Sequence, residues 1–108
     1  MESVSIPDVV AFSAEKRVRK ALIKAPNLIC EIVCYEPGQG TAMHHHPRQD
    51  ELYYVIEGKG TITIEEESIV AGPGKLVIVP AQKRHSTYAA ADSRWVFLFV
   101  KGPGTSLT

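Results

Sequence analysis

Three histidines and one glutamate are spaced in this sequence so that they could hold one metal ion. His44 and His46 are separated by one residue, Glu51 opens the next apolar segment, and His85 follows a later one. Side chains two residues apart point to the same side of a strand, whereas on a helix they are roughly 200° apart. The two histidines therefore suit metal binding only in an extended segment. Three imidazoles and one carboxylate suit a divalent transition metal ion: Mn, Fe, Co, Ni, Cu or Zn.

The residues around the two histidines favour that extended segment. Gly38 and Gly40 precede the pair and Pro47 follows it, which is typical of turns at both ends of a short strand. Residues 52–56 are aromatic and aliphatic and predict the next strand, so Glu51 can fold back beside the histidines. If the ion is octahedral, four protein ligands leave two positions for water, substrate or dioxygen, as a catalytic centre requires.

The rest of the chain predicts an all-β fold in one domain. Short apolar or alternating segments are separated by Gly and Pro turns, and none has helical periodicity, which indicates a sandwich or a barrel. This pattern alone leaves immunoglobulin-like and jelly-roll forms open. We expect an N-terminal arm over 1–15 with a short strand near 9–12, the β domain over 16–101, and a tail over 102–108. Its expected strands are 16–24, 28–36, the histidine segment, 51–57, 61–65, 68–71, 75–79, 85–88 and 94–101.

The spacing around the histidines resembles the first sequence motif of the cupin family, G-x5-H-x-H-x3,4-E-x6-G. All five fixed positions are matched, by Gly38, His44, His46, Glu51 and Gly58. A match of this length and composition is specific for the family.

The second cupin motif, G-x5-P-x-G-x2-H-x3-N, is matched in part. Gly74, Pro80 and His85 stand at its fixed positions, whereas Gln82 replaces the usual glycine and Ala89 replaces a frequent asparagine. Neither departure falls on a metal ligand of the family, so they concern the local turn and the flank of the site.

The resemblance implies a fold, a cofactor and an assembly. The fold would be the double-stranded β-helix, or jelly roll, as one cupin barrel with the ligands inside one end. The implied ligands of one divalent transition metal ion are His44, His46, Glu51 and His85. Small cupins are commonly homodimers, and the same assembly is implied here.

Alternation along residues 51–57 predicts which side chains line the interior. Those on the side of Glu51 are Tyr53, Val55 and Glu57, and those facing outward are Leu52, Tyr54 and Ile56. Tyr53 is then the polar ring nearest the metal on this strand, either as a catalytic proton donor or as a wall residue. His45, between two ligands, should point away from the site.

Two apolar faces predict a covered outer surface. Trp95, Phe97 and Phe99 share one side of the last strand, and Val96, Leu98 and Val100 share the other. A strand that is apolar on both sides is covered on both sides. Together with the outward residues of 51–57, this predicts a homodimer interface.

Charge and cysteine content restrict the partners and the compartment. Lys+Arg and Asp+Glu both total 12, so nothing indicates nucleic acid or an anionic membrane. No apolar run approaches about 20 residues, and the N-terminus lacks a secretory pattern, so we expect a cytoplasmic protein. Cys30 and Cys34 would lie about 13 Å apart on one strand, beyond the roughly 7 Å that a disulfide spans. We expect reduced thiols on a shared face, which could point into the barrel.

Cationic residues stand in two regions, each with two interpretations. Segment 16–24 alternates cationic and apolar residues, as an edge strand that resists pairing with other strands does. A basic binding stripe is disfavoured there, because the net charge is zero and no aromatics are interleaved. Loop residues near the expected ligands either rim the pocket, favouring an anionic or carbonyl substrate, or are solvated. These are Arg48, Gln49, Gln82, Lys83 and Arg84.

Two kinds of function fit these observations. The first is a metal-dependent enzyme acting on a small organic substrate. The resemblance favours a dioxygenase-like oxidoreductase, followed by an isomerase, lyase or decarboxylase. The second is a non-catalytic small-molecule binding or sensing module. The complete ligand set favours the enzyme, since a pure effector pocket need not keep all four groups, and a purely structural role ranks below both.

Overall fold

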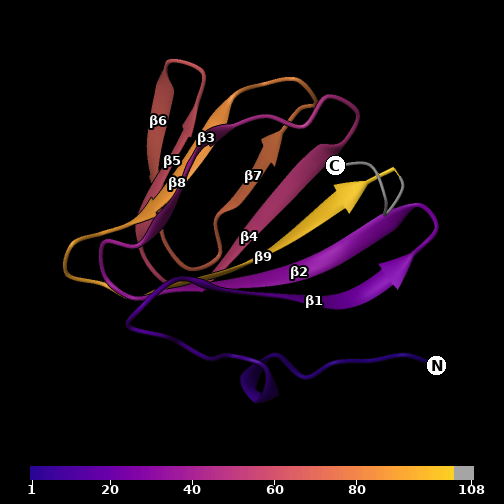
Figure 1. The fold of residues 1–108 in the computed structure, drawn as a ribbon, viewed down its shortest axis with the longest axis horizontal. Helices are drawn as coiled ribbons and strands as arrows, with labels where there is room; N and C mark the ends of the chain where they lie inside the picture. Colours follow the sequence, from indigo (N-terminus) through magenta and orange to yellow (C-terminus); the bar gives the residue numbers. More distant parts are fainter. Residues whose placement is uncertain (104–108) are drawn as a thin grey trace.

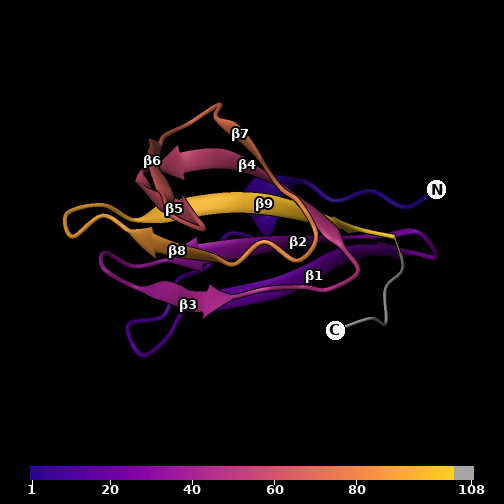
Figure 2. The same ribbon diagram turned by 90° about the horizontal axis from the view of Figure 1, so that it is seen from above.

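Two antiparallel β-sheets face each other in the computed structural model, which describes residues 1–103 (Figure 1). The strand order is β1-β2-β9-β4-β7 in one sheet and β3-β8-β5-β6 in the other. Figure 2 shows β1 and β3 along one side of the molecule and β6 and β7 along the opposite side. The strands are β1 (Val18–Ala25), β2 (Leu28–Tyr35), β3 (Gly40–His44), β4 (Asp50–Gly58), β5 (Gly60–Ile64), β6 (Glu67–Ala71), β7 (Leu76–Val79), β8 (His85–Ala89) and β9 (Trp95–Gly102).

The strands of the β domain form where the sequence predicts them, with small shifts at their ends. Strand β1 is an edge strand, as its alternating charges indicate. The arm contains one turn of 3-10 helix, η1 (Ile6–Asp8), and no strand forms at 9–12. Of the expected tail, Gly102 ends β9, and residues 104–108 lie outside the described part of the chain. None of the helical segments described here is long and apolar enough to cross a membrane.

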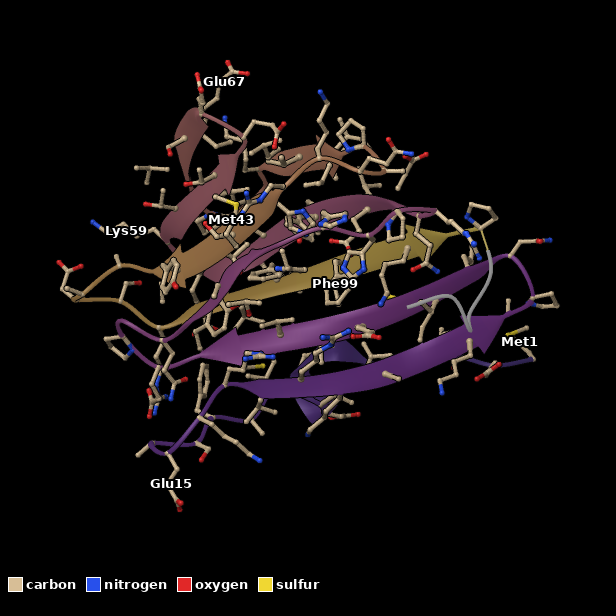
Figure 3. All side chains as sticks on the ribbon, turned by 45° about the horizontal axis from the view of Figure 1, so that its top comes forward. Met1, Glu15, Met43, Lys59, Glu67 and Phe99 are labelled. Atoms are coloured by element: carbon tan, nitrogen blue, oxygen red, sulfur yellow. The ribbon has the colours of Figure 1, made fainter. Side chains whose placement is uncertain are left out.

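The core between the sheets contains the inward residues of β9 and β4. Trp95, Phe97 and Phe99 are buried there, as alternation predicts, and Figure 3 shows the Phe99 ring between the sheets. Tyr53 and Val55 are buried in the same core. Burial of these apolar and aromatic surfaces is the main force that holds the two sheets together.

The inward position predicted for Glu57 is wrong. The pairing of β4 with β9 shifts register between Val55 and Glu57, so that Glu57 is exposed. A bulge of this kind inserts one extra residue and moves every later side chain to the other face. The outward positions of Leu52 and Tyr54 are confirmed, since both are exposed.

The outer face of β2 and β9 is covered by the N-terminal arm of the same chain. Ile32, Cys34 and Val96 form a buried cluster there, and partly buried apolar residues pack against it: Ile6, Val9, Val10, Phe12, Val18, Leu22, Ile56 and Leu98. Figure 1 shows the arm running below β1 and β2. Both cysteines are free thiols, as expected, but Cys34 faces the arm and not the interior of the barrel. Part of the apolar surface attributed to a dimer interface is therefore covered within the chain.

Gly58 is required at the end of β4 for two physical reasons. Its φ is +73°, a left-handed conformation that side chains disfavour, and a Cβ there would collide with the carbonyl oxygen of Arg94. Gly74 shares the first constraint, with φ +86°, but has open space around the position of a Cβ. Gly58 and Gly74 therefore share the backbone constraint, and the collision is found at Gly58 alone of the two.

We expect Gly58→Ala to destabilise the fold by roughly 3 kcal/mol, because backbone strain and the collision add. Gly74→Ala is the matched control, which should lose only about 1 kcal/mol from the backbone term. Urea unfolding followed by circular dichroism measures both free energies. Equal losses in the two variants would refute the role of the Arg94 contact.

Candidate metal centre

Four groups predicted as metal ligands come together from both sheets. His44 ends β3 and pairs with His85, the first residue of β8, while Glu51 lies in β4 of the opposite sheet. His46 lies two residues beyond the end of β3 rather than within a strand. The carboxylate therefore faces the imidazoles across the interior.

The three imidazoles lie close to one another, and the Glu51 carboxylate adjoins two of them. Ring nitrogens of His44, His46 and His85 lie within 4.8 Å of one another. The Glu51 oxygens lie 2.7 Å from His46 Nε2 and 3.3 Å from His85 Nε2. Two ligand atoms about 2.1 Å from one ion and at right angles to each other are about 3 Å apart. The described residues thus offer three grouped imidazoles that could close around one ion by small side-chain movements, with Glu51 beside His46 and His85.

Backbone carbonyls fix the orientation of two of the imidazoles. His44 Nδ1 lies 2.7 Å from the carbonyl oxygen of Ala42, and His85 Nδ1 lies 2.9 Å from that of Lys83. A carbonyl can only accept, so Nδ1 donates in each ring and Nε2 keeps its lone pair when the ring is neutral. Such support from outside the ligand set is usual around metal-binding histidines.

The pKa values of the cluster favour the forms that bind metal at His44, His46 and Glu51. Burial lowers the pKa of His44 and of His46, so both rings are neutral near pH 7. Burial raises the pKa of Glu51, but contacts with His85 and Tyr53 outweigh it and hold the pKa below its ordinary value. Burial lowers the pKa of His85, but the Glu51 contact outweighs it and the net shift is upward. A metal ion would compete with the proton that Glu51 stabilises on this ring.

Two buried polar atoms of the cluster, Glu51 Oε2 and His85 Nε2, make no hydrogen bond of good geometry among the described residues, although each lies close to another group of the cluster. Such atoms are costly unless a cation, a proton donor or water satisfies them. The other Glu51 oxygen accepts a hydrogen bond of 2.7 Å from the Tyr53 hydroxyl. The donor set and these two atoms fit a divalent cation.

Tyr53 is buried against this carboxylate, and its hydroxyl is already in use. Burial, and then the charge of Glu51, raise the pKa of Tyr53 far above its ordinary value. The phenol therefore keeps its proton at physiological pH and orients Glu51. His45 is exposed beside the cluster, as expected.

A narrow cavity of about 30 Å³ lies beside the cluster, large enough for one or two water molecules. A larger ligand must extend toward the cavity mouth. The cavity is lined by Arg17, Arg19, Val33, Tyr35, Thr41, His44, His46, Glu51, Tyr53, Thr87, Phe97 and Phe99.

The cavity's cationic residues come from β1 and the residue before it, not from the predicted loops. Arg48, Gln82, Lys83 and Arg84 are not among the described residues that line it, and Gln49 is buried. Arg17 and Arg19 line it instead, although the sequence interpretation disfavoured a basic stripe in that segment. Their spacing of two residues was a usable signal, because it places both on one face of a strand.

Gln82 shows what the departure from the second motif does to the turn before His85. It adopts a positive φ of 72°, the conformation that the usual glycine would adopt without strain. Its backbone N–H donates a 2.8 Å hydrogen bond to the carbonyl oxygen of His46, so this turn holds one candidate ligand beside another.

The fold and the histidine cluster define a double-stranded β-helix protein with a candidate metal site. Residues 31–101 match the family model of the cupin domain, and the chain belongs to the cupin family. A solved structure of similar fold is the protein TT1209 from Thermus thermophilus, with a TM-score of 0.90 and 24% identity. That match covers 95% of this chain and 98% of the other.

Two curated relatives carry names of enzymes. A glucose-6-phosphate isomerase of Thermococcus kodakarensis is 36% identical over 67 residues, covering 56% of this chain and 35% of the relative. A 5-nitrosalicylic acid 1,2-dioxygenase of a Bradyrhizobium species is 30% identical over 67 residues, covering 62% of this chain and 32% of the relative. The chain spans about a third of the length of these relatives.

We expect Gln82→Gly to stabilise the protein by about 0.5–1 kcal/mol, because glycine relieves the strain of the positive φ. The neighbouring change Lys83→Gly has no such strain to relieve and should destabilise by a similar amount. Thermal unfolding of both variants measures the difference. A Gln82→Gly protein less stable than the parent would contradict the strain.

Proposed function

We propose that this cupin is a metal-dependent enzyme acting on a small organic substrate. His44, His46, Glu51 and His85 would hold one divalent transition metal ion. The observation that carries this proposal is the cluster of three imidazoles beside a buried carboxylate, two of them with Nε2 within 3.3 Å of a Glu51 oxygen. A closed structural role would not explain why a cavity with polar walls adjoins the cluster.

The reaction class that we favour is that of a dioxygenase-like oxidoreductase, with isomerase, lyase or decarboxylase chemistry as the next candidates. A bound Fe or Cu ion would supply redox chemistry with dioxygen, and a Zn ion would supply Lewis-acid chemistry. Support comes from the two relatives named as a dioxygenase and an isomerase, each matched over part of its length. In this arrangement Tyr53 orients Glu51 and is a positioning residue.

One observation favours the second function, a non-catalytic binding or sensing module. The hydroxyl of Tyr53 is bonded to Glu51, so the candidate proton donor is not free to reach a substrate. Dioxygen chemistry needs no such donor at this position, which is why it ranks first among the enzymatic reactions. Substrate-dependent dioxygen uptake by the iron-loaded or copper-loaded protein, abolished in His46→Ala, separates the two functions.

We expect one equivalent of transition metal per chain in the purified, untagged protein and a loss of at least about 100-fold in affinity in His46→Ala, because one of the four ligands is removed. His45→Ala is the matched control, since that exposed ring lies outside the cluster and should not change affinity. Elemental analysis and competition with a chelator measure both. Full metal binding by His46→Ala, or none by the parent after reconstitution, would refute the metal site.

The same measurement of metal affinity by competition with a chelator tests the role of Tyr53. Tyr53→Phe removes the hydrogen bond to Glu51 and should weaken metal binding about 10-fold. Tyr54→Phe, on the exposed face of the same strand, should bind as the parent does.

We propose that the protein is a homodimer through the outer face of β4 and β7. Leu52 pairs with Ile78 and Tyr54 pairs with Leu76, and all four side chains are exposed at 37–58%. This apolar surface remains after the arm has covered β2 and β9, and a second copy would bury it.

A particle of twice 11.9 kDa is expected by chromatography with light scattering. Leu76→Lys should shift it toward the monomer, because a buried charge without a partner is costly. Val70→Lys, a change of an exposed residue on β6 in the other sheet, should leave the dimer intact. A parent protein with the mass of one chain would refute the interface.

A further inference from the structure

Two arginines beside β1 line the same cavity as the candidate ligands. Arg19 pairs with Val33 of β2, and Arg17, just before Val18, follows the same register opposite Tyr35. Val33 and Tyr35 belong to the core between the sheets, so both guanidinium groups stand on the inner side. They lie on the side of the molecule where β1 and β3 form the edges of the two sheets (Figure 2).

The two arginines differ in what they contact. Arg19 forms an ion pair with Glu31, whose other oxygen lies 3.9 Å from the buried ammonium group of Lys101. Its guanidinium also lies 5.3 Å from the centre of the Phe99 ring, so it has partners within the chain. Arg17 is exposed and forms no hydrogen bond or ion pair within residues 1–103. A cation that lines a cavity but has no partner is available to a ligand.

The charges around the cavity favour an anion. The charged residues that line it are Arg17 and Arg19, both cationic, and Glu51, which is anionic. Behind them Lys101 and Glu31 form an ion pair with each other and add no net charge. With neutral imidazoles this leaves an excess of one positive charge, and a divalent ion at the histidines would increase it. A cavity that carries an excess of charge of one sign between low-dielectric walls attracts ligands of the opposite charge.

A group of hydroxyls on the cavity wall has a proton left to donate. The Tyr35 hydroxyl lies 2.7 Å from Thr41 Oγ1 and 2.7 Å from Thr87 Oγ1. The three hydroxyls carry three protons, and these two hydrogen bonds use two of them. The third proton has no acceptor among the described residues, and all three side chains line the cavity.

We propose that the cavity binds a small organic acid whose carboxylate is held by Arg17 and by the hydroxyls of Tyr35, Thr41 and Thr87. A planar guanidinium matches a carboxylate with two parallel hydrogen bonds, and the spare hydroxyl proton supplies a third. A hydroxyl or carbonyl oxygen next to the carboxylate would then point toward His44 and His46. This inference rests on the proposed metal site and adds the class of substrate.

The test uses two probes of nearly equal shape, glycolate and glycolamide, titrated into the zinc-loaded protein by calorimetry. The parent protein should bind glycolate at least about 10-fold more tightly, as expected for a charge-assisted hydrogen bond. Because glycolate can also bind zinc through its carboxylate, the decisive comparison is between variants. Arg17→Gln should lose most of the preference, while Arg48→Gln, which changes an exposed arginine outside the cavity, should keep it.

The acid site would be overturned if the parent showed no preference for glycolate, or if Arg17→Gln showed the same preference as the parent. Either result would leave the proposed metal site intact. The exposed position of Arg17 means that its loss should not disturb the fold, which the circular dichroism spectrum checks. A protein that binds no zinc refutes the proposed function separately. In that case the same titration of the metal-free protein decides: an Arg17-dependent preference supports the acid site, and none overturns it.

Discussion

The burial of the Glu51 carboxylate is the constraint on which the interior of this sandwich depends. Its side chain is 2% exposed, and an isolated carboxylate at that depth would be protonated or would unfold its surroundings. The chain compensates for it with imidazoles from the opposite sheet and with the Tyr53 hydroxyl from its own strand. Lys101 and Arg19 add positive charge behind them, themselves balanced by Glu31. The polar part of the interior therefore contains two groups of paired charges, one around Glu51 and one around Glu31, and the aromatic core packs beside them.

This division of the interior gives the molecule two unlike sides. On the side of β1 and β3, arginines and hydroxyls meet the histidine cluster at a narrow opening. On the side of β7, the exposed outer face of β4 and β7 is apolar and includes Leu52, Leu76 and Ile78. The first side suits a charged small molecule, and the second suits another protein surface. The N-terminal arm covers the outer face of β2 and β9, so neither ligand binding nor the proposed dimer has to use that face.

Much of this arrangement could be predicted from sequence, because it follows from alternation and motif spacing. The strands, the inward set Glu51, Tyr53 and Val55, and the two faces of β9 all follow from a period of two residues. Glu57 could not be predicted, since a bulge leaves no mark in a pattern of single residues. Cover by the arm was missed because its apolar residues have no strand period. The place of Arg17 and Arg19 in the cavity wall was not predicted, because the net charge of a chain describes its whole surface and not one cavity.

The candidate ligands belong to both sheets, and this has a mechanical consequence. His44 and His85 sit on neighbouring strands of one sheet and Glu51 on the other, so an ion held by all of them would cross-link the two layers. Its binding free energy would count in full toward the stability of the folded chain, since the unfolded chain cannot present the same set. Removal of the ion by a chelator would then weaken the packing of the two sheets as well as the chemistry of the site.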